Sequence, residues 1–548
     1  MSTVVAAPAY VHGASDVPLR GETIGALWDA VVAAHGGRDA LVSRHQGIRW
    51  TYSELGEQVE RCARGLLAEG VEKGDRVGIW SPNNAEWVVV QFATAKIGAI
   101  LVNVNPAYRQ HELEYALRQS GCSLLVLAPG FQDADYGELL SGVDAPALRR
   151  EVVLGEGWES LLARAEEMPV EALREREGEL GFDDPINIQY TSGTTGFPKG
   201  ATLSHHNILN NGFFIGETLA YTEEDRVCIP VPFYHCFGMV LGNLAVVTHG
   251  ACIVLPAEGF KARAVLEAVV AERCTALYGV PTMFIAELAE PDFAAFDLST
   301  LRTGIMAGSP CPIAVMKRVR AEMHMGEVTI CYGMTETSPV SAQTRRDDPI
   351  EKRVASVGRV HPHVELKIVD PATGRTVGRG ETGELCTRGY CVMLGYWEND
   401  EATRETIDET RWLHTGDVAV IDEEGYVNIV GRIKDMIIRG GENVYPREIE
   451  EFLYAHPAIA DVQVVGVPSE RYGEEVCAWV ILREGADLDE EGLVEFCRGK
   501  IARFKIPRTV RFVDAFPLTV TGKVQKFRMR EAEIAEQGLE AAAATRSA

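Results

Sequence analysis

The sequence predicts an α/β fold: a large N-terminal domain with mixed or parallel sheets flanked by helices, followed by a smaller α+β domain. Short apolar runs alternate with helical stretches, as in Arg76–Trp80, residues 85–98 and Ile100–Val104. Strand, helix and strand at this spacing predict right-handed parallel crossovers. A chain of 548 residues is also too long for one hydrophobic core, so at least two domains are expected.

Local signals mark where elements and domains begin. Thr51 followed by Glu54 predicts a capped helix start, and residues 81–84 predict the turn after the first apolar run. After about residue 417 the pattern changes, because residues 431–441 are rich in glycine and charge and lead into a shorter α+β pattern. We therefore expect a boundary before Lys434, with domains at residues 1–433 and 434–548.

Charge and cysteine content narrow the class of protein. A formal net charge of −26 argues against a protein that coats nucleic acid, because phosphate backbones are bound through surplus Lys and Arg. The twelve cysteines are scattered singly, which is typical of reduced, buried thiols in the cytosol. Neither a targeting signal nor an apolar stretch of the roughly 20 residues that span a membrane is evident. We expect a cytoplasmic protein without an integral membrane segment.

The most informative segment is residues 190–200, which read YTSGTTGFPKG between an expected strand at residues 186–190 and an expected helix start at residues 204–210. Glycines let backbone N–H groups converge on an anion, while hydroxyls and a lysine add donors for phosphate oxygens. A flexible surface loop is the alternative. The candidate phosphate-binding residues are Thr191, Ser192, Gly193, Thr194, Thr195, Gly196 and Lys199.

The loop departs from the G-x-x-x-x-G-K-[ST] pattern of nucleotide triphosphatases. Pro198 occupies the place of the second glycine, and Gly200 follows Lys199 where Ser or Thr is required. This departure weakens a kinase or ATPase interpretation.

With the motifs at residues 307–310, 332–337, 412–417, 431–443 and 517–523, the sequence resembles the AMP-forming acyl-CoA synthetase family from about Thr23 to Arg530. That superfamily of acyl-adenylate-forming enzymes also holds beetle luciferases and peptide-synthetase adenylation domains. The resemblance implies ATP, Mg²⁺ and coenzyme A as cofactors, and a C-terminal domain that is mobile. Members of this family are often dimers, so the resemblance is compatible with a homodimer.

The resemblance assigns nucleotide roles to three motifs. Tyr332 would lie against the adenine, Thr335 would reach the α-phosphate, and Glu336 would help hold Mg²⁺, which prefers oxygen ligands. Asp417 would accept hydrogen bonds from the ribose hydroxyls, although an Asp after Gly is more often a turn residue. Arg432 would reach the ribose and phosphates. The remaining candidates in this set are Gly308, Ser309, Pro310 and Gly333.

The C-terminal motifs imply two surfaces used in turn. Lys434 falls at the family's hinge, while Gly440 and Gly441 would let the pantetheine chain of coenzyme A approach the backbone. The resemblance also places Asn443 near the nucleotide phosphates. Lys523 would bridge the substrate carboxylate and the α-phosphate as the catalytic lysine, offsetting the repulsion between two anions.

The acyl pocket is expected around His235, in a gating rather than proton-transfer role; a hydrogen-bonded core histidine is the alternative. The pocket positions are Tyr234, His235, Met239, Gly279, Val280, Cys331, Gly333 and Val340. None carries a charge for an amino group, which suits an alkyl or aryl chain. The segments at residues 205–211, 278–284 and 307–310 are most similar to the medium-chain fatty acyl-CoA synthetase branch, and Met239 stands where some long-chain relatives carry a Trp gate.

The resulting hypothesis is an acid–thiol ligase that forms an acyl-adenylate from a medium-chain fatty acid and transfers the acyl group to coenzyme A. Long-chain or aryl acids, and a carrier protein in place of coenzyme A, are the enzymatic alternatives. A nucleotide-binding sensor is the non-enzymatic one, and it does not require Lys523.

Overall fold

The structure, a computed structural model, describes residues 7–191, 198–309, 311–440, 442–469, 471–519 and 524–539. Its Cα atoms form two compact units. Within the described ranges, the large unit contains residues 11–366 and 387–414, and the small unit contains residues 7–10, 367–386 and those from 415 onward. These units describe how the chain packs and not which parts move, so the predicted boundary of the mobile domain before Lys434 stays a prediction.

The first sheet of the large unit has the strand order β21-β11-β10-β5-β4-β6-β9. Strands β10, β5, β4, β6 and β9 are parallel, as the alternating pattern predicts, and β11 and β21 extend the sheet in antiparallel pairing. Their bounds are Gly395–Tyr396, Lys199–Ser204, Pro185–Thr191, Ile100–Val104, Arg76–Trp80, Leu124–Leu127 and Arg150–Val153, in sheet order.

The second sheet of the large unit has the order β18-β17-β16-β15-β14-β12-β13-β2-β3. From β16 to β2 all neighbouring strands are parallel. Their bounds are Arg359–Val360, Val340–Gln343, Glu327–Gly333, Thr303–Met306, Ala276–Gly279, Arg226–Cys228, Cys252–Leu255, Asp39–Ser43 and Ile48–Thr51, in sheet order. The carboxyl ends of β12, β14, β15 and β16 therefore share one edge.

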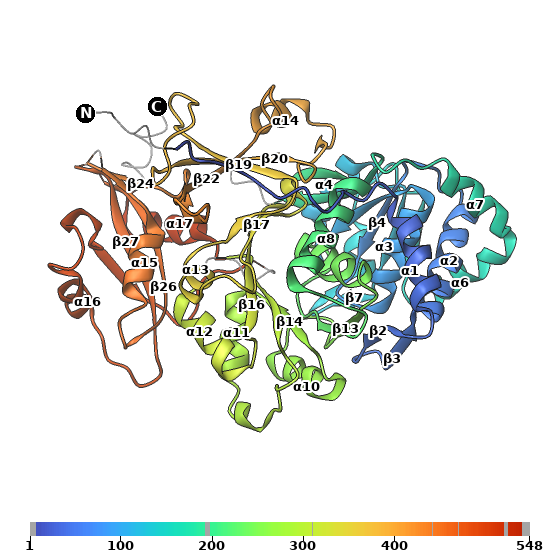
Figure 1. The fold of residues 1–548 in the computed structure, drawn as a ribbon, viewed down its shortest axis with the longest axis horizontal. Helices are drawn as coiled ribbons and strands as arrows, with labels where there is room; N and C mark the ends of the chain where they lie inside the picture. Colours follow the sequence, from blue (N-terminus) through green and yellow to red (C-terminus); the bar gives the residue numbers. More distant parts are fainter. Residues whose placement is uncertain are drawn as a thin grey trace. The chain divides into compact units, whose positions relative to one another are not determined.

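Helices of the large unit begin where the sequence provides caps. Thr51 and Glu54 form the predicted capping box at the start of α2, and Asn84 caps α3. Figure 1 shows α1, α2 and α3 in blue beside β4 of the first sheet. The main helices are α1 (Ile24–His35), α2 (Tyr52–Ala68), α3 (Ala85–Ile97), α4 (Gln110–Ser120), α8 (His205–Leu219), α10 (Ala262–Glu272), α11 (Pro281–Leu288) and α12 (Ile313–Glu322).

The predicted helix start is confirmed, because α8 begins behind its N-cap Ser204, but the residues before it form a strand that was not predicted. The chain forms β11 before α8, so the predicted phosphate-binding loop connects two strands. β11 pairs antiparallel with β10, with Thr191 opposite Lys199. The strand was missed because Gly200 and its small and hydroxyl neighbours form no apolar run. Their tight fit against β10 supplies the packing, since a Cβ on Gly200 would come within 2.9 Å of Ile188.

The small unit contains a hairpin and a separate sheet. β22 (Leu413–Ile421) and β23 (Val427–Arg432) flank a turn in which the Tyr426 carbonyl accepts the Asp422 N–H. The sheet has the order β25-β24-β27-β26, with β28 beside β27. Its elements are β24 (Ile437–Arg439), β25 (Glu442–Val444), β26 (Ile459–Ser469), β27 (Gly473–Leu482) and β28 (Thr509–Phe512), with helices α15 (Pro446–Leu453), α16 (Glu490–Cys497) and α17 (Lys526–Gln537).

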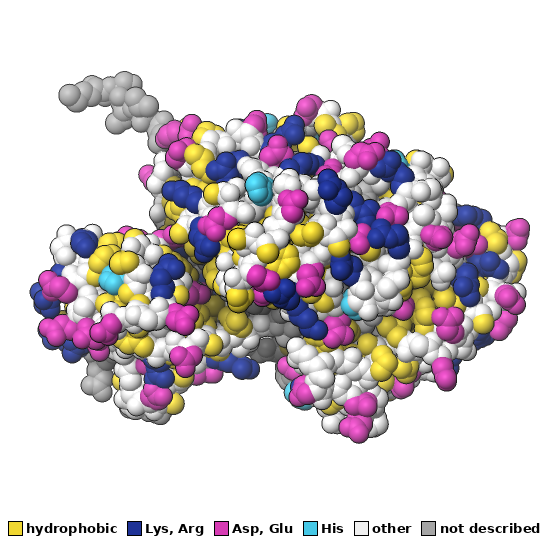
Figure 2. All heavy atoms as spheres, turned by 90° about the horizontal axis from the view of Figure 1, so that it is seen from below, with side chains coloured by type: hydrophobic (Ala, Val, Ile, Leu, Met, Phe, Trp, Pro, Cys, Tyr) yellow, Lys and Arg dark blue, Asp and Glu magenta, His cyan; other side chains and the backbone are white. Residues whose placement is uncertain are grey.

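Surface charge and thiols agree with the composition. On the face drawn in Figure 2, acidic and basic side chains are interspersed. All twelve cysteines are free, and all but Cys331 are buried. Among the helices in the described ranges, none combines the length and apolar character that crossing a bilayer requires.

One buried acid is exceptional. Glu287 on α11 is fully buried, and neither carboxyl oxygen has a hydrogen-bond partner in the described part of the chain. Burial raises the pKa of this carboxyl well above its ordinary value of 4.5. The folded chain therefore keeps the Glu287 proton at a pH where the unfolded chain has released it.

We predict that Glu287→Gln stabilises the protein at neutral pH. Because the folded pKa is raised, the wild-type side chain loses stability as pH rises above about 4.5, by about 1.4 kcal/mol per pH unit until the folded carboxyl ionises. Glutamine does not titrate, so its advantage should grow from pH 5 to pH 7 in urea unfolding followed by tryptophan fluorescence. Glu171→Gln on the exposed face of α7 (Val170–Gly178) is the matched control. Parallel pH dependences of wild type and Glu287→Gln would contradict the prediction.

Candidate functional site

The carboxyl edge of the second sheet gathers most of the predicted pocket. β12, β14, β15 and β16 are neighbouring parallel strands, and their following loops emerge at this edge. Ligands of α/β sheets bind at such carboxyl edges. The predicted residues at or just beyond these strand ends are Tyr234 and His235 after β12, Gly279 and Val280 at β14, Gly308 and Ser309 after β15, and Cys331, Tyr332 and Gly333 on β16.

Two of these glycines fill positions that a side chain could not. Gly308 has φ +90°, in the left-handed region, and a Cβ there would lie 3.0 Å from Val280. At Gly333 a Cβ would lie only 1.7 Å from the carbonyl oxygen of Pro339. Both positions therefore keep the edge open by lacking a side chain.

Glu336 lies in a short turn, η4 (Thr335–Thr337), directly after β16. Its carboxylate is buried and accepts a hydrogen bond from the Tyr396 hydroxyl at 2.9 Å, with the Thr191 hydroxyl 3.4 Å from the same oxygen. Lys199 places its ammonium 5.0 Å from the centre of the Tyr396 ring. Residues from the phosphate loop, β16 and β21 thus meet around one carboxylate.

The Tyr396 phenol is held as a donor. Burial, and then the neighbouring Glu336 carboxylate, raise the pKa of this phenol, so it stays protonated at neutral pH. A protonated hydroxyl facing a carboxylate makes a charge-assisted hydrogen bond. Tyr396 consequently fixes the direction of the Glu336 carboxylate.

His235 has a defined tautomer. Its Nδ1 accepts the backbone N–H of Phe237 at 3.1 Å, so the neutral ring carries its proton on Nε2. The Cys236 thiol lies 3.6 Å from the same Nδ1 and 3.7 Å from the hydroxyl of the buried Thr335. His235 therefore cannot use Nδ1 as a base without breaking the Phe237 contact.

The residues around Glu336 fit a divalent cation bound to phosphates. Within the described residues, no Lys or Arg forms an ion pair with this buried carboxylate, and its neighbours Thr191 and Tyr396 supply only hydroxyl groups. An ionised carboxylate in such surroundings is favoured by a cation, and Mg²⁺ is bound by one or two carboxylates together with phosphate oxygens. Lys199, 5.0 Å from the Tyr396 ring, adds a cation on the phosphate side.

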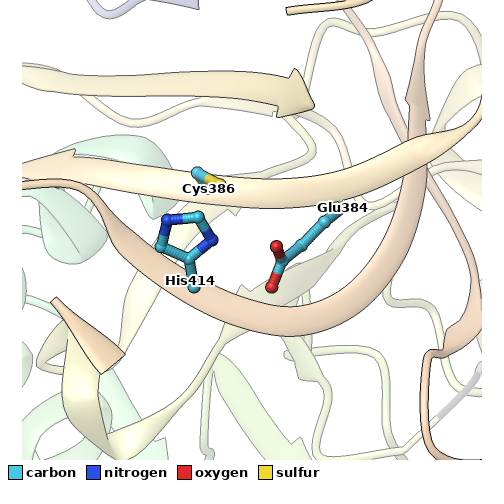
Figure 3. Close-up of side chains that lie close together, drawn as sticks. All are labelled: Glu384, Cys386 and His414. Atoms are coloured by element: carbon cyan, nitrogen blue, oxygen red, sulfur yellow. The ribbon is translucent and has the colours of Figure 1, made fainter. Parts of the chain in front are cut away.

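The small unit presents a second group of predicted residues. Asp417 and Arg432 face each other across β22 and β23, with Arg432 Nε 3.1 Å from the Asp417 carboxylate. Asp417 is mostly buried, whereas Arg432 is more than half exposed. The turn before Asp417 is held by Glu384, drawn in Figure 3 on β20 (Gly383–Gly389), whose carboxylate accepts the N–H of Gly416 at 3.2 Å.

The other described residues of the small unit lie further along the chain. Lys434 is exposed after β23, and Asn443 is exposed on β25. Gly440 turns the chain between β24 and β25 with φ +61°, and its N–H is accepted by the Tyr472 carbonyl at 2.8 Å. A left-handed residue here requires glycine or strain, independently of any ligand.

Several predicted residues fall outside the described part of the chain, and the structure does not place them. These are Ser192, Gly193, Thr194, Thr195, Gly196, Pro310, Gly441 and Lys523. The loop is described only through its flanks, Thr191 and Lys199. The pocket residues Met239, Val280 and Val340 are described and buried.

Sequence reasoning missed Tyr396 and Glu384. Tyr396 sits on the two-residue strand β21, which pairs with β11, so its approach to Glu336 depends on a contact between distant segments. Glu384 lies in a strand with no motif around it. The only local signal for Tyr396 was an aromatic pair, Tyr396 and Trp397, after Gly395, which also occurs in ordinary turns.

Comparisons with known proteins agree with this geometry. The family model described as AMP-binding enzyme matches residues 28–397, and the model described as AMP-binding enzyme C-terminal domain matches residues 448–523. YngI of Bacillus subtilis (strain 168), which carries a provisional acyl-CoA synthetase name, is 50% identical over 93% of this chain and 97% of its own. The mitochondrial medium-chain acyl-CoA ligase ACSF2 of Danio rerio is 46% identical, over 97% of this chain and 91% of its own.

Solved structures give the same fold. ATP-bound MatB from Rhodopseudomonas palustris matches with a TM-score of 0.84 and 31% identity, covering 93% of this chain and 99% of MatB. The anthranilate CoA ligase AuaEII in complex with anthranoyl-AMP matches with a TM-score of 0.84 and 29% identity, covering 94% of this chain and 98% of AuaEII. The predicted α/β fold class is confirmed.

We predict that Tyr396→Phe weakens Mg²⁺-dependent ATP binding. Removing the hydroxyl releases the Glu336 carboxylate from a charge-assisted hydrogen bond, and the loss should raise the dissociation constant for ATP on the order of tenfold. Isothermal titration with ATP at several Mg²⁺ concentrations measures it. Tyr52→Phe removes a buried hydroxyl that donates to the Ala251 carbonyl, and provides the control. Equal effects of the two variants would count against a role of Tyr396 at the metal.

Proposed function

The chain belongs to the AMP-binding enzyme family and is an AMP-forming acyl-CoA synthetase that uses ATP, Mg²⁺ and coenzyme A; from that premise we propose that its acids are medium-chain fatty acids. The enzyme would form an acyl-adenylate with release of pyrophosphate, and then transfer the acyl group to the thiol of coenzyme A with release of AMP. The observation that carries the site assignment is the meeting of Thr191, Tyr396 and Glu336 beside Lys199.

For the first half-reaction we assign the phosphate side to the large unit. Thr191, Lys199 and Thr335 would bind phosphate oxygens, and Tyr332 would lie against the adenine. Glu336 would hold Mg²⁺, which would offset the negative charge of the phosphates. The attacking carboxylate is itself an anion, so donors and cations fixed in place before the reaction lower the barrier without reorganisation.

For the ribose we assign Asp417 and Arg432. Their 3.1 Å contact fixes the direction of the mostly buried Asp417 carboxylate, which would accept hydrogen bonds from the two ribose hydroxyls. Arg432 is more than half exposed, and its planar guanidinium suits a bidentate contact with a phosphate.

We further propose that residues 434–548 move as a domain relative to residues 1–433, with Lys434 as hinge. Lys523 would serve adenylation in one orientation, and Gly440 and Gly441 would line the pantetheine path in the other, with Asn443 near the phosphates. Hinge residues often lie at element ends, and Lys434 follows the end of β23.

The preference for medium-chain acids is supported by two observations. ACSF2, named as a medium-chain ligase, is 46% identical to this chain. In addition the predicted pocket positions Met239, Val280 and Val340 are apolar and buried. We also propose a cytoplasmic location, supported by twelve free thiols, and a homodimer, supported by family resemblance alone; cell fractionation and light scattering test the two.

The acid preference is tested by a panel of straight-chain acids from four to sixteen carbons and benzoate, scored by AMP release with and without coenzyme A. We expect release that depends on coenzyme A and is greatest for acids of about six to twelve carbons, because an apolar pocket gains affinity with each methylene until its end wall is reached. A maximum at sixteen carbons or with benzoate would replace the medium-chain proposal. Release that requires a carrier protein instead of coenzyme A would contradict the thioester assignment.

The division of roles predicts that Lys523→Ala separates the half-reactions. Adenylation, measured by acid-dependent exchange of pyrophosphate into ATP, should fall on the order of 100- to 1000-fold because one charge-stabilising group is lost. Thioester formation from a supplied acyl-adenylate and coenzyme A should persist. Equal loss in both assays would refute the assignment, and Lys526→Ala, a nearby lysine paired with Glu450, is the control.

A further inference from the structure

A ladder of buried amide side chains crosses two strands of the first sheet. Asn187 and Gln189 are two residues apart on β10 and so share one face, and Gln189 is opposite Asn103 on β5. The Gln189 amide donates to the Asn187 carbonyl at 2.8 Å, and the Asn187 amide donates to the Asn103 carbonyl at 2.9 Å. All three side chains are at most 2% exposed.

The ladder ends on the sulfur of Met239. The Asn103 and Gln189 amide nitrogens each donate to the Met239 Sδ at 3.3 Å. Asn103 also donates to the carbonyl of Tyr234 at 3.0 Å, next to His235. A thioether is a weak acceptor, yet here it takes two amide N–H groups that are buried from water.

The backbone around Met239 is held from the other side. Met239 lies in η2 (Phe237–Leu244), a π-helical segment whose residues are all buried. The Gln91 amide on α3 donates to the Met239 carbonyl at 3.2 Å, and Gln91 in turn accepts from Asn243 at 2.8 Å. π-Helical turns are rare and occur mostly at functional sites. Both the backbone and the side chain of Met239 are therefore fixed by amides from outside its own turn.

We propose that Gln189 and Asn103 are positioning residues that hold Met239 as the end wall of the acyl pocket, and so set the longest acid the enzyme accepts; this rests on the proposed function. Methionine ordinarily adapts to its surroundings because three torsions rotate freely. Met239 cannot, since turning its sulfur away would leave two buried N–H donors without an acceptor, which is unfavourable.

The same arrangement explains why an alkyl chain stops there. The amides that contact the thioether are already hydrogen-bonded, Gln189 to Asn187 and Asn187 to Asn103. A methyl or methylene pushed past Met239 would break these hydrogen bonds without replacing them. The proposed end wall is thus a methionine side chain, which is normally flexible, held in one conformation by Asn103 and Gln189.

The test compares the ratio of kcat/KM for dodecanoate to that for octanoate, from AMP release by the full-length enzyme. Met239→Ala removes the wall, so the ratio should rise on the order of tenfold or more. Gln189→Met, which keeps the length of the side chain but cannot donate, should raise the ratio about threefold although Met239 is intact. Met323→Leu, at another fully buried methionine just beyond α12, is the control and should leave the ratio unchanged.

The decisive measurement is Gln189→Met in the Met239→Ala background. If Gln189 acts by holding the Met239 side chain, its substitution should have little effect once that side chain is removed, and the ratio should change by less than about twofold. An equal change in both backgrounds, or an unchanged ratio in Gln189→Met alone, would overturn the proposal. If Gln189→Met fails to fold, Gln189→Leu serves in both backgrounds. The proposed function is tested separately from this ratio. It would be overturned if the wild-type enzyme released AMP equally well without any acid.

Discussion

The chemistry of the large unit depends on the parallel pairing of β12, β14, β15 and β16. Because parallel strands all present their carboxyl ends at one edge, loops near residues 235, 280, 308 and 333 lie together although about a hundred residues separate the first from the last. Gly308 and Gly333 are part of the same constraint, since a Cβ at Gly333 would collide with the Pro339 carbonyl. Any loss of strand register would therefore disturb the predicted acyl pocket and the predicted nucleotide-binding segments together.

The carboxylate of Glu336 connects this edge to the other sheet. Thr191 ends β10 and Tyr396 lies on β21, both in the first sheet, and both reach Glu336 in the turn after β16 of the second. A buried anion between two sheets is costly unless a cation or several donors compensate it. The side chains that we propose for phosphate and Mg²⁺ binding thus also connect the two sheets.

Much of this fold could be predicted because its signals are local. Arg76–Trp80 is an apolar run and forms β4, and the Thr51–Glu54 box starts α2. Strand β11 could not be predicted in the same way, since its small residues gain burial only by pairing with β10. Tyr396 and the amide ladder could not be predicted for a related reason. Polar residues in a strand normally indicate a face exposed to solvent, and only the strand register shows that Asn103 lies beside Gln189. The proposed roles of Thr191 and Asp417 rest on their sequence motifs, whereas only the structure shows which residues contact and orient them.

The burial of the cysteines has a consequence for an enzyme that makes an acylating agent. A mixed anhydride reacts with thiolates, and the chain contains twelve thiols of its own. Burial raises the pKa of Cys122, Cys252 and Cys391 to about 12, so almost none of these groups is ionised at neutral pH. Because the thiolate is the nucleophile, these side chains are protected from self-acylation while an incoming thiol substrate is not. Selectivity for the thiol acceptor is therefore set partly by the burial of the protein's own thiols, which keeps them protonated and unreactive.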